Sequence, residues 1–344
     1  MKRFFYIAIL LTLLCCGKHP GEIHLHGDFA HLEQGEFYIY GTQGMEGSID
    51  TLHIIDGEFE YSTKLEDRAV LHILYPNYST LTVFAYNGDD IDIKGDARSL
   101  NTVKVSGNED NELYSSFRKD TEGSSGKECT ATAHRYILEH PHTLLAKYLF
   151  AEYMIGADSV THKEVAEVYD SLCKACPEDA WLSRMATKVK ASGVLKKGGT
   201  LPAFRLAMRP SQFTKNATPD TVDSKDLKGD WLLISFWASW RSGSQSALFR
   251  SRKSIREMKE KGKTLQAISY SLDVSDKSLR RVEKADSVDF HSYCDFKCFD
   301  SELAKRWGIT RLPFFILVSP DMKIEALGGD WKKDIDPKYQ ELCL

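Results

Sequence analysis

Hydrophobic positions follow three different patterns along the chain, and the first is an alternation with period two. From residue 21 to residue 107, short runs such as Ile23/Leu25 place every second apolar side chain on one face. Turn pairs such as Asp56-Gly57 separate these runs. Period-two runs about ten residues apart predict an antiparallel β-sandwich of about seven or eight strands.

From residue 108 to residue 197 the apolar spacing becomes helical. In one expected helix Val165, Val168 and Leu172 fall on a single face. Helices are expected over residues 128–140, 141–155, 161–176 and 177–190. We interpret this region as a helical connector between two domains.

Strands and helices alternate from residue 198 to residue 344. The run Trp231–Trp237 is apolar almost throughout, which is typical of a central strand buried on both faces. Further strands are expected at 265–271, 314–318 and 323–327, and helices after residue 244, at 277–284 and at 301–307. This order predicts an α/β domain with a mixed sheet.

The stretch WLLISFWASWRSGSQ, residues 231–245, closely resembles the active-site segment of thioredoxin-like proteins of the TlpA/ResA type. The segment G-x-x-x-P-x-F at 198–204 resembles the entry to the same domain, and residues 21–107 resemble the small β-domain that precedes it in envelope lipoproteins. In that family the positions of Arg241 and Ser244 hold the two cysteines of Cys-x-x-Cys. The resemblance therefore implies the scaffold of a thiol–disulfide oxidoreductase without its dithiol.

Thioredoxin chemistry needs a thiolate of lowered pKa at a helix N-terminus and a second cysteine to resolve the mixed disulfide. Arg241 cannot attack a disulfide, and the hydroxyl of Ser244 is too weak an acid to act as a thiolate does. Ser235 stands where many thioredoxins carry a buried Asp. An Arg at the start of the helix could instead bind an anion. The sequence thus predicts that the usual redox centre is absent.

The resemblance also implies a peptide-binding groove. Pro313 begins a predicted strand and is expected to be cis, as in the family, beside the active-site helix. Trp237, Trp240, Leu312 and Phe314 are expected to line this groove, which would pair with an extended peptide. The alternative is that the aromatic residues simply pack the domain.

Six cysteines beyond the N-terminal pair offer other thiols, at positions 129, 173, 176, 294, 298 and 343. Cys173 and Cys176 form a literal Cys-x-x-Cys, but they close a helix, where the dipole opposes a thiolate, so a packing or bridging role is favoured. Cys294 and Cys298 are candidates for a disulfide or a relocated redox site. Together with His291 they offer too few ligands for zinc, and no metal or cofactor is predicted.

The N-terminus has the pattern of an export signal. Lys2-Arg3 precede an apolar segment that is too short to span a bilayer, which predicts a signal peptide over residues 1–15. Leu13-Leu14-Cys15-Cys16 resembles a bacterial lipobox, with Cys16 as the lipidated residue and 16–20 as a tether. A lipid-anchored protein of the bacterial envelope, facing the periplasm or the outer surface, is expected.

The formal net charge of −4, with no long run of one sign, argues against nucleic acid as a partner. Two functions remain in competition. The first is a lipoprotein that binds a peptide, an envelope protein or an anion near the former active site. The second is a thiol oxidoreductase or peroxidase that uses Cys294/Cys298 or Cys173/Cys176. A weaker third is a scaffold whose working part is the β-domain.

Overall fold

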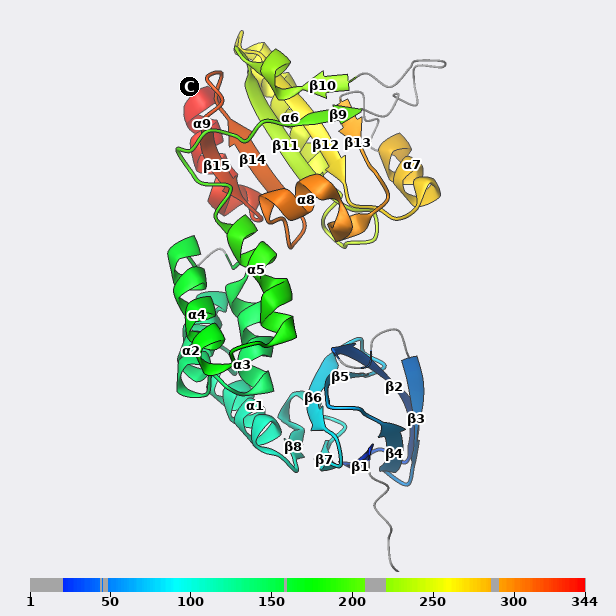
Figure 1. The fold of residues 1–344 in the computed structure, drawn as a ribbon. Helices are drawn as coiled ribbons and strands as arrows, with labels where there is room; N and C mark the ends of the chain where they lie inside the picture. The colour runs from blue at the N-terminus through cyan, green and yellow to red at the C-terminus, as the bar shows by residue number, and fades with distance from the viewer. Residues whose placement is uncertain are drawn as a thin grey trace, which may run out of the picture. The chain divides into compact units, whose positions relative to one another are not determined.

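The computed structural model describes residues 21–43, 45, 49–157, 160–207, 221–285 and 291–343. The chain divides into two compact units. The first comprises the residues up to Ser124 with Thr143–Leu145, and the second comprises Ser125–His142 with the residues from Ala146 onwards. Figure 1 shows both units.

The first unit is built on an eight-stranded sheet with the order β6-β5-β2-β3-β4-β1-β7-β8. The strands are β1 (Glu22–Ala30), β2 (Gln34–Gln43), β3 (Ile49–Ile55), β4 (Glu58–Lys64), β5 (Arg68–Leu74), β6 (Thr80–Tyr86), β7 (Asp90–Asp96) and β8 (Lys104–Ser106). This confirms a β-rich N-terminal domain with the expected alternation. It differs from the prediction in two ways: the strands belong to one sheet, and β1 pairs with β7 in parallel.

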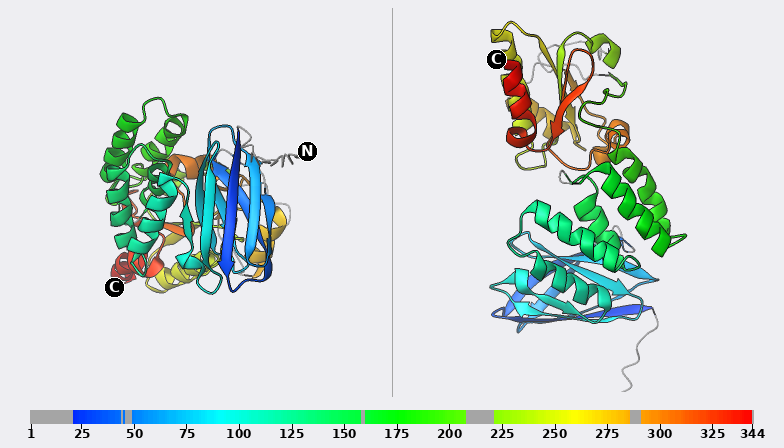
Figure 2. Two further views of the ribbon diagram at one scale, coloured as in Figure 1. Left: turned by 90° about the horizontal axis from the view of Figure 1, so that it is seen from below. Right: turned by 90° about the vertical axis from the view of Figure 1, so that its left-hand side faces the viewer.

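The sheet curls on itself (Figure 2), and its buried apolar side chains form one core. Every strand contributes to this core, from Ile23 and Leu25 on β1 to Val105 on β8. Phe37 packs edge-on against Phe29, with ring centroids 5.5 Å apart, and against Tyr75 at 4.9 Å. The curled sheet therefore encloses by itself the apolar volume that a sandwich would enclose between two sheets.

Helix α1 (Glu109–Asp120) belongs to the same unit as this sheet. Its Asn111 side chain accepts the Phe84 N–H at 2.9 Å and donates to the Phe84 carbonyl at 2.8 Å. The Tyr114 ring packs edge-on against Phe84, with centroids 5.5 Å apart. The compact units thus divide the chain after α1, whereas the predicted boundary lies at residues 107/108.

Four helical segments begin the second unit. They are α2 (Gly126–Glu139), α3 (Leu144–Leu149) continued by the π-helical turn Phe150–Met154, α4 (His162–Ala175) and α5 (Ala180–Ser192). The first two residues of α3 are counted with the first unit. Capping boxes at Ser125 and Thr161 begin α2 and α4. A buried ion pair joins Lys147 Nζ to Asp179 Oδ2 at 2.6 Å, and Asp179 also caps α5.

The rest of the second unit is an α/β domain on a mixed five-stranded sheet, with the order β13-β12-β11-β14-β15. Strands β11 (Trp231–Trp237), β12 (Leu265–Ser271) and β13 (His291–Tyr293) are parallel, whereas β14 (Phe314–Val318) and β15 (Ile324–Gly328) are antiparallel to their neighbours. A small sheet pairs β9 (Arg205–Ala207) with β10 (Thr221–Asp223).

The two faces of the five-stranded sheet carry different layers (Figure 2). Helices α6 (Ser246–Glu260), α7 (Asp276–Ala285) and α9 (Asp336–Cys343) pack on the face that holds Leu233 and Trp237. Helix α8 (Glu302–Trp307) and strands β9 and β10 cover the face that holds Ile234 and Phe236. Strand β11 is therefore buried on both faces, as its apolar run predicts.

Among the described residues, no helix is both long enough and apolar enough to cross a membrane.

Candidate functional site

The turn between β11 and α6, residues 238–245, holds both positions that the resemblance singles out. Arg241 is exposed, and its N–H donates to the Ala238 carbonyl at 3.3 Å. Ser244 is fully buried, and its Oγ accepts the Ala238 N–H at 3.0 Å. The Ser244 hydroxyl therefore closes the turn on itself, while Arg241 presents its guanidinium to solvent.

The start of α6 corrects the sequence-based prediction. The helix begins at Ser246, and Gln245 before it makes no side-chain cap. Arg241 lies five residues ahead of this start, in the turn and not in the first turn of the helix. The expectation that Arg241 lies at the start of the helix is therefore wrong, and the helix dipole, whose effect falls off within one turn, has little influence on its guanidinium.

Asp273, which the sequence reasoning did not single out, fixes the turn from the neighbouring strand. Its carboxylate is buried just beyond the end of β12. It accepts the Ser239 N–H at 3.0 Å, the Ser239 hydroxyl at 2.5 Å and the Ser271 hydroxyl at 2.6 Å. The available signal was the Ser-x-Asp at the carboxyl end of an apolar strand, an edge where functional residues of parallel sheets gather.

The two tryptophans of this segment have different roles. Trp237 is fully buried, and its Nε1–H donates to Ser269 Oγ at 2.7 Å. Trp240 is 50% exposed; its Nε1–H donates to the Leu272 carbonyl at 3.1 Å, and its ring meets Phe299 edge-on at 6.2 Å. The prediction that Trp237 lines a groove is therefore wrong, because this side chain packs the core, whereas Trp240 is accessible.

The peptide bond between Leu312 and Pro313 is cis, as the resemblance implied. Phe314 pairs with Phe236 across β14 and β11, so Pro313 lies level with the end of β11, where the turn begins. Pro313 and Phe314 are half-buried. Leu312 is only 7% exposed and belongs to the core, so its predicted place in the lining of a groove is also wrong.

Cys294 and Cys298 follow β13, at the same edge of the sheet as the turn at residues 238–245. The Cys294 thiol is buried and donates to the Asp273 carbonyl oxygen at 3.6 Å. Cys298 is half-buried at the start of a short 3₁₀ turn, with a left-handed φ of 52°. The structure thus brings Cys294 next to the residue that holds the turn.

Cys173 and Cys176 lie at the end of α4, in the helical part of the second unit. Both are half-buried, unbridged thiols within the described part of the chain. Cys176 Sγ lies 3.8 Å from the carbonyl oxygens of Pro141 and His142. These contacts suit a packing role at the close of a helix. The side chain of Cys343 and all of Cys16 lie outside the described residues.

Ser235, which stands where many thioredoxins carry a buried Asp, faces α6. Its Oγ is fully buried and lies 2.9 Å from Ser251 Oγ. Two neutral hydroxyls thus pair where a carboxylate would accept a proton. Within the described ranges, no group of three or more His, Cys, Asp or Glu side chains is placed to hold a metal ion.

Comparisons with known proteins agree with this architecture. Residues 198–327 match the AhpC/TSA family, and residues 23–114 match a domain of unknown function, DUF4369. The C-terminal part of the chain is therefore a thioredoxin-like domain of the AhpC/TSA family, preceded by a DUF4369 domain. No curated protein matches the chain.

Solved structures from Bacteroides species are similar to this chain. The C-terminal domain of a protein assigned as a thiol-disulfide oxidoreductase from B. thetaiotaomicron is 30% identical, with 43% of this chain and 96% of that chain covered and a TM-score of 0.36. A thiol-disulfide oxidoreductase from B. fragilis is 27% identical, with 42% and 99% covered and a TM-score of 0.35. A thioredoxin-like protein from B. caccae is 11% identical, with 62% and 76% covered and a TM-score of 0.42.

Proposed function

We propose that this chain is an exported, lipid-anchored envelope protein whose thioredoxin-like domain lacks the redox dithiol and binds an extended peptide or protein. The observation that carries the proposal is the chemistry of the turn at residues 238–245. Arg241 offers a guanidinium, which has no electron pair for a disulfide. Ser244 offers a hydroxyl that is fully buried and already bonded to the Ala238 N–H.

The surface beside this turn supports binding. The loops that follow the parallel strands β11, β12 and β13 carry Trp240, Val274 and Phe296, which are 50%, 65% and 37% exposed. Because parallel strands end at one edge of a sheet, these side chains lie along the same edge, which we call the corner surface. Exposed apolar side chains gathered at one place are typical of interaction sites.

The corner surface also suggests what it binds. Arg241 stands among the apolar residues and favours a carboxylate. The cis-Pro313 loop adjoins the turn, and an extended chain can pair with backbone groups at such an edge. The ligand that fits these features is an extended segment with aliphatic or aromatic side chains and at least one acidic group.

A photo-crosslinking experiment tests this. A photoreactive phenylalanine analogue is placed at Trp240, and the matched control carries it at Tyr38, which is 44% exposed on β2 of the other unit. Both are presented with synthetic ten-residue peptides, proline-free, in acidic and basic versions. We expect crosslinks at position 240 with the acidic apolar peptides only. Equal yields at the two positions would contradict the proposal.

The competing function, a redox enzyme, rests on the position of Cys294 against the Asp273 carbonyl oxygen at 3.6 Å. It predicts reduction of insulin disulfides by the purified chain, lost in Cys294→Ser or Cys298→Ser and retained in Cys173→Ser. The binding proposal predicts no turnover by any of the four proteins. Turnover that depends on Cys294 or Cys298 would replace the binding proposal by the redox one.

Lipidation is tested by labelling in a bacterial host with a radioactive fatty acid. The resemblance of residues 13–16 to a lipobox supports attachment at Cys16. We expect label in the wild type and in Cys15→Ser, and none in Cys16→Ser. Label that persists in Cys16→Ser would rule out this anchor.

A further inference from the structure

A pocket of about 430 Å³ opens on the sheet face covered by α8, and none of the residues of the turn at 238–245 lines it. Its floor is formed by two aromatic and two aliphatic residues, Phe204, Tyr270, Leu206 and Leu303. The Tyr270 ring packs against both Phe236 and Tyr293, with centroids 4.7 Å apart in each pair. The volume falls within the range of small-molecule sites.

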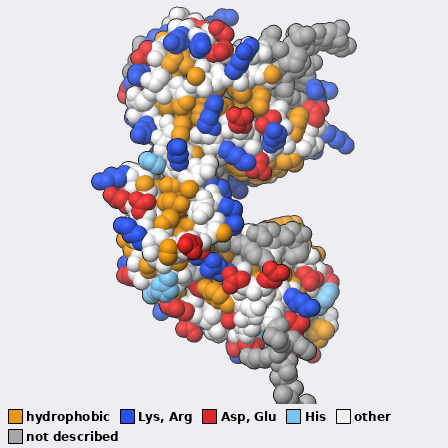
Figure 3. All heavy atoms as spheres, in the orientation of Figure 1, with side chains coloured by type: hydrophobic (Ala, Val, Ile, Leu, Met, Phe, Trp, Pro, Cys, Tyr) orange, Lys and Arg blue, Asp and Glu red, His pale blue; other side chains and the backbone are white. Residues whose placement is uncertain are grey.

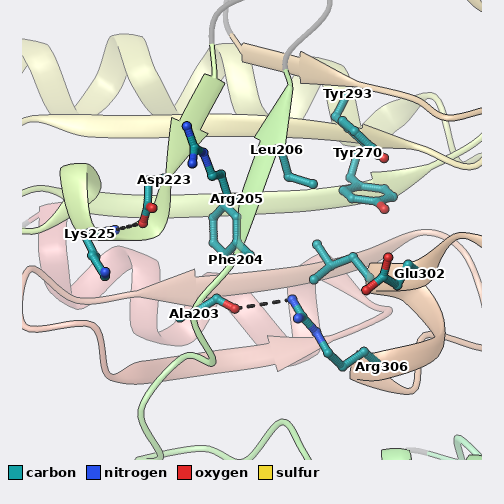
Figure 4. Close-up of a pocket in the computed structure, with 11 residues that line it drawn as sticks. Ala203, Phe204, Arg205, Leu206, Asp223, Lys225, Tyr270, Tyr293, Glu302 and Arg306 are labelled. Atoms are coloured by element: carbon teal, nitrogen blue, oxygen red, sulfur yellow. Dashed lines mark hydrogen bonds between the residues drawn. The ribbon is translucent and has the colours of Figure 1, made fainter.

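Charged side chains from three elements form the rim of the pocket. Arg205 comes from β9, Lys225 from the 3₁₀ turn after β10, and Arg306 from α8 (Figure 4). Asp223 and Glu302 are the two carboxylates of the rim. Figure 3 shows this face of the domain, where basic and acidic side chains surround apolar ones over β9 and α8.

The rim cations are largely available to a ligand. Within the described part of the chain, Arg205, Lys225 and Arg306 form no ion pair, and Arg306 donates one hydrogen bond, from Nη2 to the Ala203 carbonyl at 3.3 Å. Asp223 is already engaged, because it accepts the Lys225 N–H at 2.9 Å. Three cations against two carboxylates leave the rim with a net positive charge.

We propose that this pocket binds a small molecule in which an oxyanion, a carboxylate or a phosphate, is attached to a flat apolar body. Guanidinium groups match the planar geometry of oxyanions and bind them through two parallel hydrogen bonds. The half-buried Tyr293 ring is the part of the lining that meets the apolar body, because the floor side chains are each at most 7% exposed. This assignment is independent of the peptide-binding proposal, because the two sites share no residue.

The tyrosine hydroxyls add neutral polar groups to the pocket. Burial raises the pKa of Tyr270, whose hydroxyl lies 2.6 Å from Ser301 Oγ. Burial, followed by the charge of Asp295, raises the pKa of Tyr293. Both phenols therefore stay protonated at neutral pH and add no negative charge against the ligand.

Calorimetric titration of the full chain tests the proposal with four probes: phenyl phosphate, benzoate, inorganic phosphate and benzylamine. We expect phenyl phosphate or benzoate to bind at least about tenfold more tightly than inorganic phosphate and benzylamine. Which of the two binds more tightly decides between a phosphate and a carboxylate ligand. Tryptophan fluorescence gives a second signal, because Trp307 packs edge-on against Phe204 at 5.6 Å.

Three variants test whether the probes bind in this pocket. Arg205→Gln and Arg306→Gln should each weaken binding by about tenfold or more. Arg256→Gln, an exposed arginine on α6, is the matched control and should leave binding unchanged. Thermal unfolding confirms that each variant is folded. The proposal is overturned if neither aromatic anion binds at about 1 mM, if benzylamine binds equally well, or if Arg256→Gln weakens binding as much as the rim variants.

Discussion

The buried carboxylate of Asp273 allows the clearest test of how the turn at residues 238–245 is held. Asp273→Ala removes the acceptor of three donors: the Ser239 N–H, the Ser239 hydroxyl and the Ser271 hydroxyl. A hydrogen bond to a charged group contributes about 1.5–3 kcal/mol, so three amount to about 4.5–9 kcal/mol before corrections.

Two effects reduce this figure. Ser239 is half-buried, so water can replace the carboxylate at its two donors. The variant also no longer holds a charge out of water, which is unfavourable in the wild type. We therefore expect Asp273→Ala to lower the free energy of unfolding of the thioredoxin-like domain by about 3 kcal/mol.

Asp273→Asn removes the charge of this side chain and keeps its shape. The Ser239 and Ser271 hydroxyls can rotate to accept from the new amide, but the Ser239 N–H can only donate. One oxygen still serves this N–H, so we expect a loss of about 1–2 kcal/mol. The control is Asp226→Ala, an exposed carboxylate in the 3₁₀ turn after β10.

Two measurements check these values. Urea unfolding followed by tryptophan fluorescence gives the free energy, and hydrogen exchange of the peptide covering residues 238–245 reports the turn directly. We expect exchange in this peptide to increase in Asp273→Ala and to stay at the wild-type rate in Asp226→Ala. The reasoning is refuted if Asp273→Ala unfolds within about 0.5 kcal/mol of the wild type or leaves this exchange unchanged.

Three further predictions concern the second unit. Lys147→Met and Asp179→Asn should each lower the free energy of unfolding by about 3–5 kcal/mol, because each leaves one buried charge unpaired. The double variant removes both charges and should recover much of the loss. A double-mutant cycle measured by urea unfolding tests this, and additive losses would contradict it. Arg241→Cys with Ser244→Cys should gain insulin-reductase activity, whereas either single variant should not; an inactive but folded double variant would show that the turn cannot support dithiol chemistry. Partial desolvation raises the pKa of Glu152, and the charge of Lys188 opposes this shift. Because the Glu152 side chain is exposed, water offsets most of the cost of its charge. The protonated form is the more stable one and is lost as pH rises through the folded pKa, so Glu152→Gln should gain only a little stability over the wild type near pH 7 and match it below about pH 4 in urea unfolding; equal gains at both pH values would refute this reasoning.

The sequence predicted the central strands of the thioredoxin-like domain closely. The apolar runs at 231–237, 265–271 and 314–318 coincide with β11, β12 and β14. These strands are buried on one or both faces over their whole length, so nearly every position carries an apolar side chain or a small hydroxyl. Short helices between such runs leave few alternative topologies.

Other features depend on contacts that a local pattern does not encode. The pairing of β1 with β7 joins strands more than sixty residues apart, and nothing in either strand marks a parallel neighbour. Helix α1 has a helical period like α2, but the period does not say which domain it packs against. Arg241 was placed at the start of α6, which begins five residues later at Ser246, because Gln245 provides no capping side chain that would mark the boundary.

In the candidate site, the local sequence pattern also failed to predict the environment of single residues. Trp237 and Trp240 are three positions apart and chemically identical, yet one is in the core and the other is half exposed. The difference arises because Trp237 is the last residue of β11 and points to the α6 face, whereas Trp240 follows the strand. Asp273 was missed because hydrophobic patterns do not reveal a buried carboxylate whose partners are serines.

Taken together, the serines explain why this corner of the domain is a fixed surface. Ser235 pairs with Ser251, Ser244 accepts the Ala238 N–H, and Ser239 donates to Asp273. In each case a small neutral hydroxyl satisfies a group that burial would otherwise leave without a hydrogen bond, which keeps the turn in one conformation. A redox centre needs a thiol that changes its charge and its covalent partner at this place. Hydroxyls that are committed to the backbone and to one another do neither, which supports the proposed binding role of this corner over a redox role.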